Sequence, residues 1–243
     1  MWKWQGKPMN FVTRAIAKTT IGATVKGGTS VNYKTGEWRE SRPVFVSRMA
    51  PCREACPAGI DIQGFLWEVR HQRFNKAWKI IMEENPLPSI CGRVCGHPCE
   101  EACNRKEFDE SLAIHALERF VGDFGLENRI QMTTPKTNLR ESIAVIGSGP
   151  AGLSCAYHLR RLGYGVKVFE RSTMPGGMLR WGIPDYRLPR IILDQEIEKI
   201  RRMGVTIETK VSLGKDFLRK GLREFKAIFL ALGSQKDRKM GIP

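Results

Sequence analysis

Six of the seven cysteines fall into two short runs, and their spacing is the first sign of chemistry in this chain. The runs are Cys52-x-x-x-Cys56-Pro57 and Cys91-x-x-x-Cys95-x-x-x-Cys99-x-x-x-Cys103. Thiolates on short loops are the usual ligands of iron–sulfur clusters. Zinc is an alternative, although C-x2-C or C-x4-C pairs around one four-ligand ion are its usual pattern and six thiols exceed it. Disulfides within a run are disfavoured, because three intervening residues would close strained rings.

A glycine-rich loop follows the cysteines and reads Gly147-Ser148-Gly149-Pro150-Ala151-Gly152. This GxGxxG pattern binds dinucleotides when a strand precedes it, a helix follows it, and an acid ends the next strand to bind a ribose. Glu170 is placed to be that acid, and the next residue, Arg171, would suit a 2′-phosphate. FAD and NAD both use this fingerprint. A glycine-rich turn without a ligand is the alternative.

Composition limits the classes of protein. With 243 residues, 42% of them hydrophobic, the chain is long enough for one large or two ordinary globular domains. The net charge of +15 divides into +7 for residues 1–50, −3 for residues 51–130 and +11 for residues 131–243. This asymmetry favours an acidic partner surface or a bound dinucleotide, with solvated surface as the alternative.

Other partners and locations are disfavoured by the same sequence. Aromatic residues do not alternate with basic ones in the manner that stacks nucleic-acid bases, so no nucleic acid is expected. No apolar run approaches the ~20 residues of a membrane span, so no transmembrane segment is expected. Six clustered thiols in a redox protein indicate the reducing cytoplasm.

The chain divides into four predicted parts. Residues 1–50 form a basic arm in which Trp2, Trp4 and Trp38 would dock on this chain or on another subunit, a transit peptide being the alternative. Residues 51–132 form a helical domain with two helices inside Ile60–Met82, a third from about Pro98 and a fourth over Ala113–Phe124. Residues 133–141 are a linker. Residues 142–243 alternate strands and helices, as in a parallel sheet.

The fold class that follows is a small helical domain joined to a partial Rossmann-type, doubly wound parallel sheet. Its expected strands are Ser142–Ile146, Val166–Glu170, Val205–Thr209 and Ala227–Leu232, and its expected helices are Ala151–Leu162, Ile191–Met203 and Asp216–Phe225.

Smaller features of the two modules are also predicted. Gly92, Gly96 and Pro98 are expected to break the second cysteine run, so that it is not one helix. Pro98 would open a helix that carries Cys99 and Cys103 on one face. His97 reads as a turn residue and Cys155 as a small core residue.

Taken together, these motifs resemble one family from about Pro51 to the end of the chain. The resemblance is carried by both cysteine runs, the glycine loop, the segment Gly176–Pro189 and Ala231-Leu232-Gly233. It is to the glutamate synthase small-subunit family, shared by the N-terminal parts of dihydropyrimidine dehydrogenase and of the large subunit of NADH-dependent ferredoxin:NADP oxidoreductase. The resemblance implies a helical [4Fe-4S] domain, FAD on the glycine loop, and electron transfer between NAD(P)H and a partner redox subunit.

The resemblance also implies ligands for the iron. Cys56, Cys95 and Cys99 would bind one [4Fe-4S] cluster, with Glu118 at the position of the fourth ligand; an exposed helical acid is the alternative reading of Glu118. Relatives with a second cluster have a further pair of cysteines before Cys52, which this chain lacks. Only Cys52, Cys103 and, as a further candidate, Cys91 are left for a second cluster. The alternatives are that it is absent, that it uses these three thiols with a non-cysteine ligand, or that a partner supplies a ligand.

Further positions of the flavin site follow from the same resemblance. Gly177, Met178, Leu179, Arg187, Val211 and Gly233 would line it, and Arg187 would pair with a phosphate, a surface ion pair being the alternative. Relatives insert an NAD(P)H domain after Gly233, whereas this chain has no second GxGxxG loop. We therefore expect an N-terminal piece of a longer polypeptide, or a chain completed by a partner. A non-catalytic iron–sulfur scaffold and a zinc-bearing binding module are the rival functions.

Overall fold

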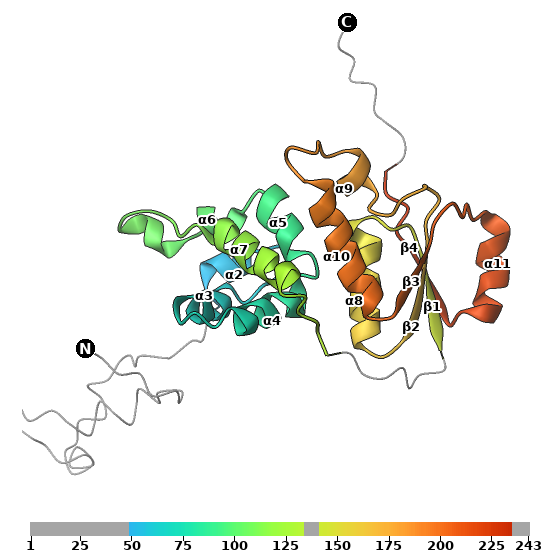
Figure 1. The fold of residues 1–243 in the computed structure, drawn as a ribbon, viewed down its shortest axis with the longest axis horizontal. Helices are drawn as coiled ribbons and strands as arrows, with labels where there is room; N and C mark the ends of the chain where they lie inside the picture. The colour runs from blue at the N-terminus through green and yellow to red at the C-terminus, as the bar shows by residue number, and fades with distance from the viewer. Residues whose placement is uncertain (1–48, 134–140, 235–243) are drawn as a thin grey trace, which may run out of the picture. The chain divides into compact units, whose positions relative to one another are not determined.

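The computed structural model describes residues 49–133 and 141–234 (Figure 1). Most of the predicted arm, most of the predicted linker and the last nine residues of the sequence lie outside the described residues. The domain boundaries at residues 50, 132 and 141 therefore stay predictions.

Short helices fold residues 51–132, which we call the helical module. They are α2 (Pro51–Ala55), α3 (Ile62–Arg70), α4 (Phe74–Glu84), α5 (Pro88–Val94), α6 (Pro98–Glu101), the 3-10 turn η3 (Asn104–Glu107) and α7 (Ile114–Glu127). The carboxylate of Asp61 caps α3 by accepting a hydrogen bond from the Gly64 amide at 3.1 Å. Apolar residues at helical spacing form the core, with Phe65, Trp78 and Val121 fully buried.

The predicted helix break at Gly92 is wrong, because α5 runs through this residue. A Cβ built on Gly92 would lie 2.5 Å from the Arg119 Cα, and one on Gly122 would lie 2.6 Å from the Ser89 amide nitrogen. Both glycines therefore let α5 and α7 approach each other at backbone contact, at a cost of about 1 kcal/mol each in helix propensity. The predicted break at Gly96 and Pro98 is confirmed, since α5 ends before Gly96 and α6 begins at Pro98.

The expectation that Cys99 and Cys103 share one helix face is also wrong. Helix α6 ends at Glu101, and Cys103 stands at the N-terminus of η3 with an extended backbone. The run of two glutamates and an alanine after Cys99 reads as helix, but the turn stops after four residues. The two thiols are consequently free to face different neighbours.

The sheet module, residues 142–234, contains β1 (Ser142–Ile146), β2 (Gly165–Phe169), β3 (Val205–Glu208) and β4 (Ala227–Leu230). The strands pair in parallel in the order β3-β2-β1-β4. Helices α8 (Pro150–Arg161) and α10 (Arg190–Arg202) cover one face, and α11 (Lys215–Glu224) covers the other (Figure 1). This is the predicted doubly wound sheet, and the direction of winding switches at β1, where such folds bind ligands.

The two modules share one hydrophobic core and a set of polar contacts. Tyr157 of α8 donates to the Met82 carbonyl oxygen at 2.6 Å, and the Ser89 amide of α5 donates to Glu196 of α10 at 2.9 Å. Lys199 pairs with Glu196 and stands 5.8 Å from the centre of the Trp78 ring. Glu196, Lys199 and Tyr157 are all buried. Helix α5, which carries Cys91, is thus packed directly on a helix that covers the sheet.

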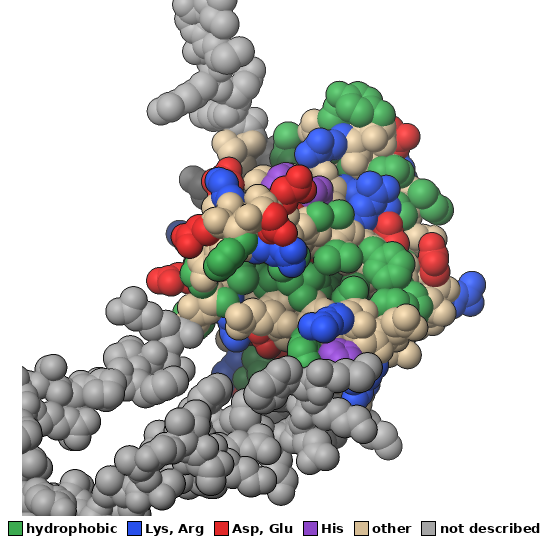
Figure 2. All heavy atoms as spheres, turned by 90° about the vertical axis from the view of Figure 1, so that its left-hand side faces the viewer, with side chains coloured by type: hydrophobic (Ala, Val, Ile, Leu, Met, Phe, Trp, Pro, Cys, Tyr) green, Lys and Arg blue, Asp and Glu red, His purple; other side chains and the backbone are tan. Residues whose placement is uncertain are grey.

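The surface of the helical module has both apolar and charged regions. Figure 2 shows a face on which hydrophobic side chains gather between charged ones. Exposed large hydrophobic residues of this module include Trp67, Phe108 and Phe120. Within residues 49–133 and 141–234, no helix has both the length and the apolar character needed to cross a bilayer.

Candidate functional site

Three thiols and one carboxylate from different elements converge in the helical module. Cys56 follows α2, Cys95 follows α5, Cys99 lies in α6, and Glu118 lies in α7. Burial first, and then the nearby charges of Cys56, Glu100, Cys95 and Glu118, raise the pKa of the Cys99 thiol to about 12. The thiolate form of Cys99 is therefore disfavoured unless a positively charged group such as the iron of a cluster lies beside it.

Glu118 is buried rather than exposed, so its reading as a solvated helical acid does not hold. Only 8% of its surface is accessible, and its carboxylate accepts a hydrogen bond from the Asn85 side-chain amide at 2.7 Å. Burial raises the pKa of Glu118 to about 7, against the lowering effect of that hydrogen bond. The charge of Glu118 acts on the thiols of Cys91 and Cys99, and a buried carboxylate near thiols can serve as an oxygen ligand for iron.

Asn85 is a member of this group that the sequence did not reveal. Its side-chain oxygen accepts from the Leu87 amide at 3.0 Å and lies 3.6 Å from the Cys91 sulfur. Burial and the charge of Glu118 raise the pKa of Cys91 to about 12. In the sequence, Asn85 stands just before Pro86 and Pro88, and this pattern predicts only a turn. Its contact with Glu118 could not be predicted, because it depends on how α4 packs against α7.

Cys52 and Cys103 form a separate pair. Cys103 is near enough to raise the pKa of Cys52, although burial is the larger cause of that shift. Besides burial, the charges of Glu118, Cys95 and Glu196 raise the pKa of Cys91, so Cys91 lies beside the first group. Of the candidate ligands for a second cluster, the structure therefore brings the thiols of Cys52 and Cys103 close to each other. Cys155, on α8, packs against the core as predicted.

The thiols are spaced more widely than the ligands of a single zinc ion. Four sulfurs on one zinc ion, with bonds of ~2.3 Å, lie only about 3.8 Å apart. Among the residues that the structure describes, no three thiols have their sulfurs within 4.8 Å of one another. A cubane holds its thiolates farther apart, at its corners. The His97 amide also donates to the Cys95 sulfur at 3.3 Å, a contact of the kind that tunes iron–sulfur potentials.

The glycine loop forms a cradle at the carboxyl end of β1. Gly147 has φ +104°, and a Cβ there would lie 2.3 Å from the Ala231 carbonyl oxygen; a Cβ on Gly152 would lie 1.9 Å from the Gly147 carbonyl oxygen. A Cβ on Gly149 would meet only the Gly177 Cα, at 4.0 Å. The outer glycines are thus required by the protein's own packing, while the space over Gly149 is open to a ligand.

Helix α8 begins behind this cradle without a side-chain cap. Pro150 occupies its first turn, where the missing N–H costs nothing. The first amides of a helix have no partner inside the helix and lie at the positive end of its dipole. Gly149, Pro150, Ala151 and Gly152 therefore present a site suited to a pyrophosphate.

Glu170 lies behind the loop and holds it. The carboxylate is 8% exposed and accepts from the Ser148 amide at 2.9 Å, the Ser148 hydroxyl at 2.5 Å and the Ser172 amide at 2.8 Å. Burial opposes ionisation, but these hydrogen bonds outweigh it and lower the pKa of Glu170. Each carboxylate oxygen can accept more than one hydrogen bond, so the predicted contact with a ribose hydroxyl stays available.

The other predicted flavin residues lie around the same edge of the sheet. The Val211 amide donates to the Glu170 carbonyl oxygen at 2.9 Å, and Gly233 follows β4 with φ +66°. Gly177 has φ +53° and touches Gly149, and Leu179 is buried in the short helix α9 (Met178–Trp181), which the sequence did not predict. Three side chains are exposed, namely Arg171, Met178 and Arg187. Their contacts with FAD stay predictions.

Each of the two modules matches a known domain family. Residues 35–130 match the family described as dihydropyrimidine dehydrogenase domain II, 4Fe-4S cluster. Residues 145–191 match the family described as an NAD(P)-binding Rossmann-like domain. The first match covers all six clustered cysteines and Glu118, and the second covers the glycine loop and Glu170.

Curated relatives align with most of this chain. The NADPH-Fe(3+) oxidoreductase subunit beta of Geobacter sulfurreducens is 41% identical over 197 residues, which are 79% of this chain and 29% of that one. The NAD-dependent dihydropyrimidine dehydrogenase subunit PreT of Salmonella typhimurium is 37% identical over 80% of this chain and 48% of its own length. The glutamate synthase [NADPH] small chain of Bacillus subtilis is 35% identical over 75% of this chain and 40% of its own.

The chain spans less than half the length of each of these relatives. The relatives are named as subunits or chains of oxidoreductases, and both matched domain families are found here in the same order as the two modules of the fold. The resemblance predicted from the motifs is therefore confirmed. Over three quarters or more of its length, the chain is similar to a group of proteins that includes PreT and the glutamate synthase small chain.

Proposed function

We propose that this chain is the electron-transfer module of a flavin- and iron–sulfur-containing oxidoreductase, working between NAD(P)H and a partner redox subunit. The observation that carries the proposal is the convergence of Cys56, Cys95, Cys99 and buried Glu118 in a module packed against the dinucleotide-binding sheet. The proposal includes one [4Fe-4S] cluster at this group, and FAD in the cradle of Gly147–Gly152.

In this function the cofactors supply the redox chemistry, FAD exchanging two electrons with NAD(P)H and iron–sulfur clusters passing one at a time. The protein holds the cofactors in position. The glycine loop and the start of α8 bind a pyrophosphate, Glu170 fixes the loop, and α2, α5, α6 and α7 each bring one ligand to the iron. Because α5 is hydrogen-bonded to α10, the distance between the two sites is held by buried contacts.

The remaining components belong outside this chain in our proposal. An NAD(P)H-binding domain would lie in the rest of a longer polypeptide or in another chain, since the relatives are more than twice as long as the part aligned here. The partner would be a redox subunit with an acidic surface, which the net charge of +15 would attract. The thiol-rich composition supports a reducing compartment such as the cytoplasm.

The test uses the longest polypeptide that contains this chain, purified without oxygen. Iron, acid-labile sulfide and flavin are measured per chain, and reduction by NADH and by NADPH is followed by visible absorbance. We expect four irons per cluster and one FAD. Gly149→Ala should lower the FAD content about tenfold while leaving the melting temperature of the flavin-free protein unchanged, because the added methyl group fills ligand space rather than protein space. Gly214→Ala is the matched control, since a Cβ there meets nothing within 4 Å.

Three outcomes would contradict this proposal. A protein with iron but no flavin would indicate an iron–sulfur scaffold, and a protein with zinc in place of iron would indicate a zinc-binding module. An unchanged FAD content in Gly149→Ala would show that the glycine loop is not the flavin site.

A further inference from the structure

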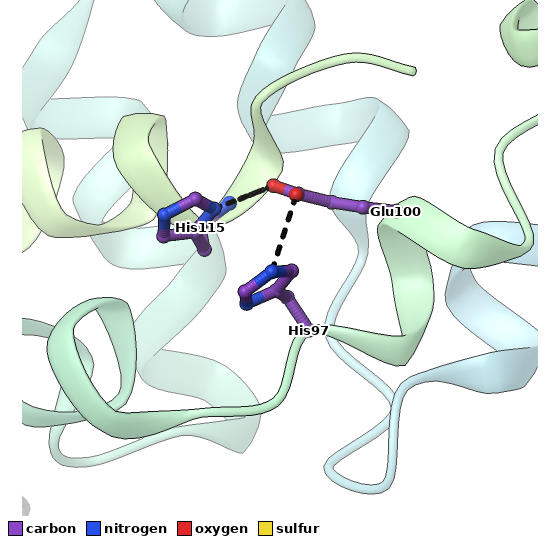
Figure 3. A group of neighbouring side chains, drawn as sticks. All are labelled: His97, Glu100 and His115. Carbon is purple, nitrogen blue, oxygen red and sulfur yellow. Dashed lines mark hydrogen bonds and ion pairs between the residues drawn. The ribbon is translucent and has the colours of Figure 1, made fainter.

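A second group of metal-ligand side chains lies beside the proposed cluster and has no part in it. We searched the described part of the chain for three or more His, Cys, Asp or Glu residues whose ligand atoms all lie within 4.8 Å of one another. One such group was found, and it consists of His97, Glu100 and His115. Figure 3 shows both imidazole rings turned toward the Glu100 carboxylate. His97 precedes α6, Glu100 lies in α6, and His115 lies in the first turn of α7.

The distances within this group are those of ligands around one ion. The His115 Nδ1 lies 2.7 Å from one Glu100 oxygen, and the His97 Nε2 lies 3.7 Å from the other. Nitrogen and oxygen ligands of a tetrahedral zinc ion, with bonds of ~2.0–2.1 Å, lie about 3.3 Å apart. The observed separations fall on either side of that value, so small rotations of the side chains would complete the site.

The surroundings of the group hold its ligand atoms in place. The Nδ1 of His97 lies 3.2 Å from the Cys95 carbonyl oxygen. Because a carbonyl oxygen only accepts, this Nδ1 is the donor, which leaves the Nε2 of a neutral ring with the lone pair that binds a metal. Backbone carbonyls commonly orient histidine ligands of metals in this way. The carboxylate of Glu100 is fixed by the His115 backbone amide at 2.9 Å.

The two rings are also fixed relative to each other. They stack with their centres 4.3 Å apart and an angle of 15° between their planes. The side chains of His97 and His115 are 38% and 39% exposed, and that of Glu100 is 14% exposed. An ion held by all three would therefore remain open to solvent on one side.

We propose that His97, Glu100 and His115 bind a divalent transition-metal ion in an open three-ligand site, distinct from the thiol sites. Two imidazoles and one carboxylate form a donor set that suits Zn²⁺ or Fe²⁺, with water completing the coordination. The ion would link the segment between Cys95 and Cys99 to the start of α7, three residues before Glu118. It would thus fix the frame that carries the proposed cluster ligands, a role beyond the electron transfer proposed above.

The test uses the full chain with its iron in place, prepared without oxygen, dialysed against Zn²⁺ and then against metal-free buffer. Zinc and iron are counted by elemental analysis, and zinc X-ray absorption identifies the ligand atoms. We expect one zinc per chain with only nitrogen and oxygen neighbours. His97→Ala, His115→Ala and the isosteric Glu100→Gln should each weaken zinc binding by about tenfold or more, with iron unchanged. His71→Ala is the control, since His71 is an exposed histidine of the same module.

Each other outcome overturns the proposal. Sulfur neighbours around zinc would place the ion on the thiols. Retention of no zinc by the parent chain, or equal retention by the parent and the three variants, would show that the group is a hydrogen-bonded cluster only. The absorption measurement on the parent chain decides the question even where a variant fails to fold.

Discussion

At the scale of the residue, the most informative feature is the set of buried ionisable side chains among the cysteines. Cys91, Cys99 and Glu118 each have a raised pKa for which burial is the first cause. The ionised forms of such groups are costly to bury together unless a ligand or metal compensates their charge. The thiol spacing could be read from the sequence. The burial of Glu118 and its bond to Asn85 could not, because they depend on how α4 and α7 pack.

Substitution of Glu118 tests its role as a ligand. Glu118→Ala should lower the iron content of the anaerobically purified chain, and Glu118→Cys should restore it, because thiolate is the usual ligand for iron in such clusters. Iron per chain and the electron paramagnetic resonance spectrum of the reduced protein measure this. Glu101→Ala is the matched control, since Glu101 is an exposed acid of α6. Equal iron in Glu118→Ala and the parent chain would rule out the carboxylate as a required ligand.

At the scale of the element, length decides which predictions succeed. The predicted strands and helices of the sheet module agree with the observed ones to within two residues, because an apolar pattern repeats in each. The two helices predicted inside Ile60–Met82 are α3 and α4, although α4 continues to Glu84. Helices α2, α5 and α9 were not predicted, as helices of seven residues or fewer contain too few turns to show a period. The helix break predicted at Gly92 was wrong because the low helix propensity of glycine was considered alone. The close packing of α7 on α5, which requires a glycine here, cannot be seen in the sequence.

A pair of glycine substitutions isolates this packing. Gly92→Ala gains about 1 kcal/mol in helix propensity but forces a methyl group onto the Arg119 backbone, and overpacking costs about 1–3 kcal/mol or more where backbone must move. We expect a net loss of stability of about 1–2 kcal/mol, measured by urea denaturation. Gly96→Ala, in the same cysteine run, should change stability by less than about 0.5 kcal/mol, because a Cβ there meets nothing within 4 Å. A stabilised Gly92→Ala would refute the close contact.

At the scale of the whole molecule, a buried ion pair couples the two modules. Glu196 of α10 accepts from the Ser89 amide of α5 and pairs with Lys199, and both side chains are at most 5% exposed. The sequence does not predict that this pair is buried, because acidic and basic residues three positions apart also occur on many solvent-exposed helices. Only the docking of α5 on α10 buries it.

Removing one partner should therefore destabilise the chain strongly. Lys199→Met leaves the Glu196 charge buried, which costs about 3–5 kcal/mol, and the double variant Glu196→Gln with Lys199→Met should recover part of the loss. Urea denaturation measures both. Arg202→Met is the control, because its pair with Glu198 on the same helix is nearly half exposed and such pairs contribute only about 0–1 kcal/mol. Equal losses for Lys199→Met and Arg202→Met would contradict the coupling.

The strand order has one more consequence, for the newly made chain. β1 is bordered by β2 on one side and by β4 on the other, yet β4 is translated about eighty residues after β1. Until that late strand leaves the ribosome, the apolar β1 has an unpaired edge open to other nascent chains. The carbonyl group of Ala231, against which the first glycine of the cradle packs, arrives only with it. We therefore expect the cradle to take its final form only at the end of this stretch of synthesis.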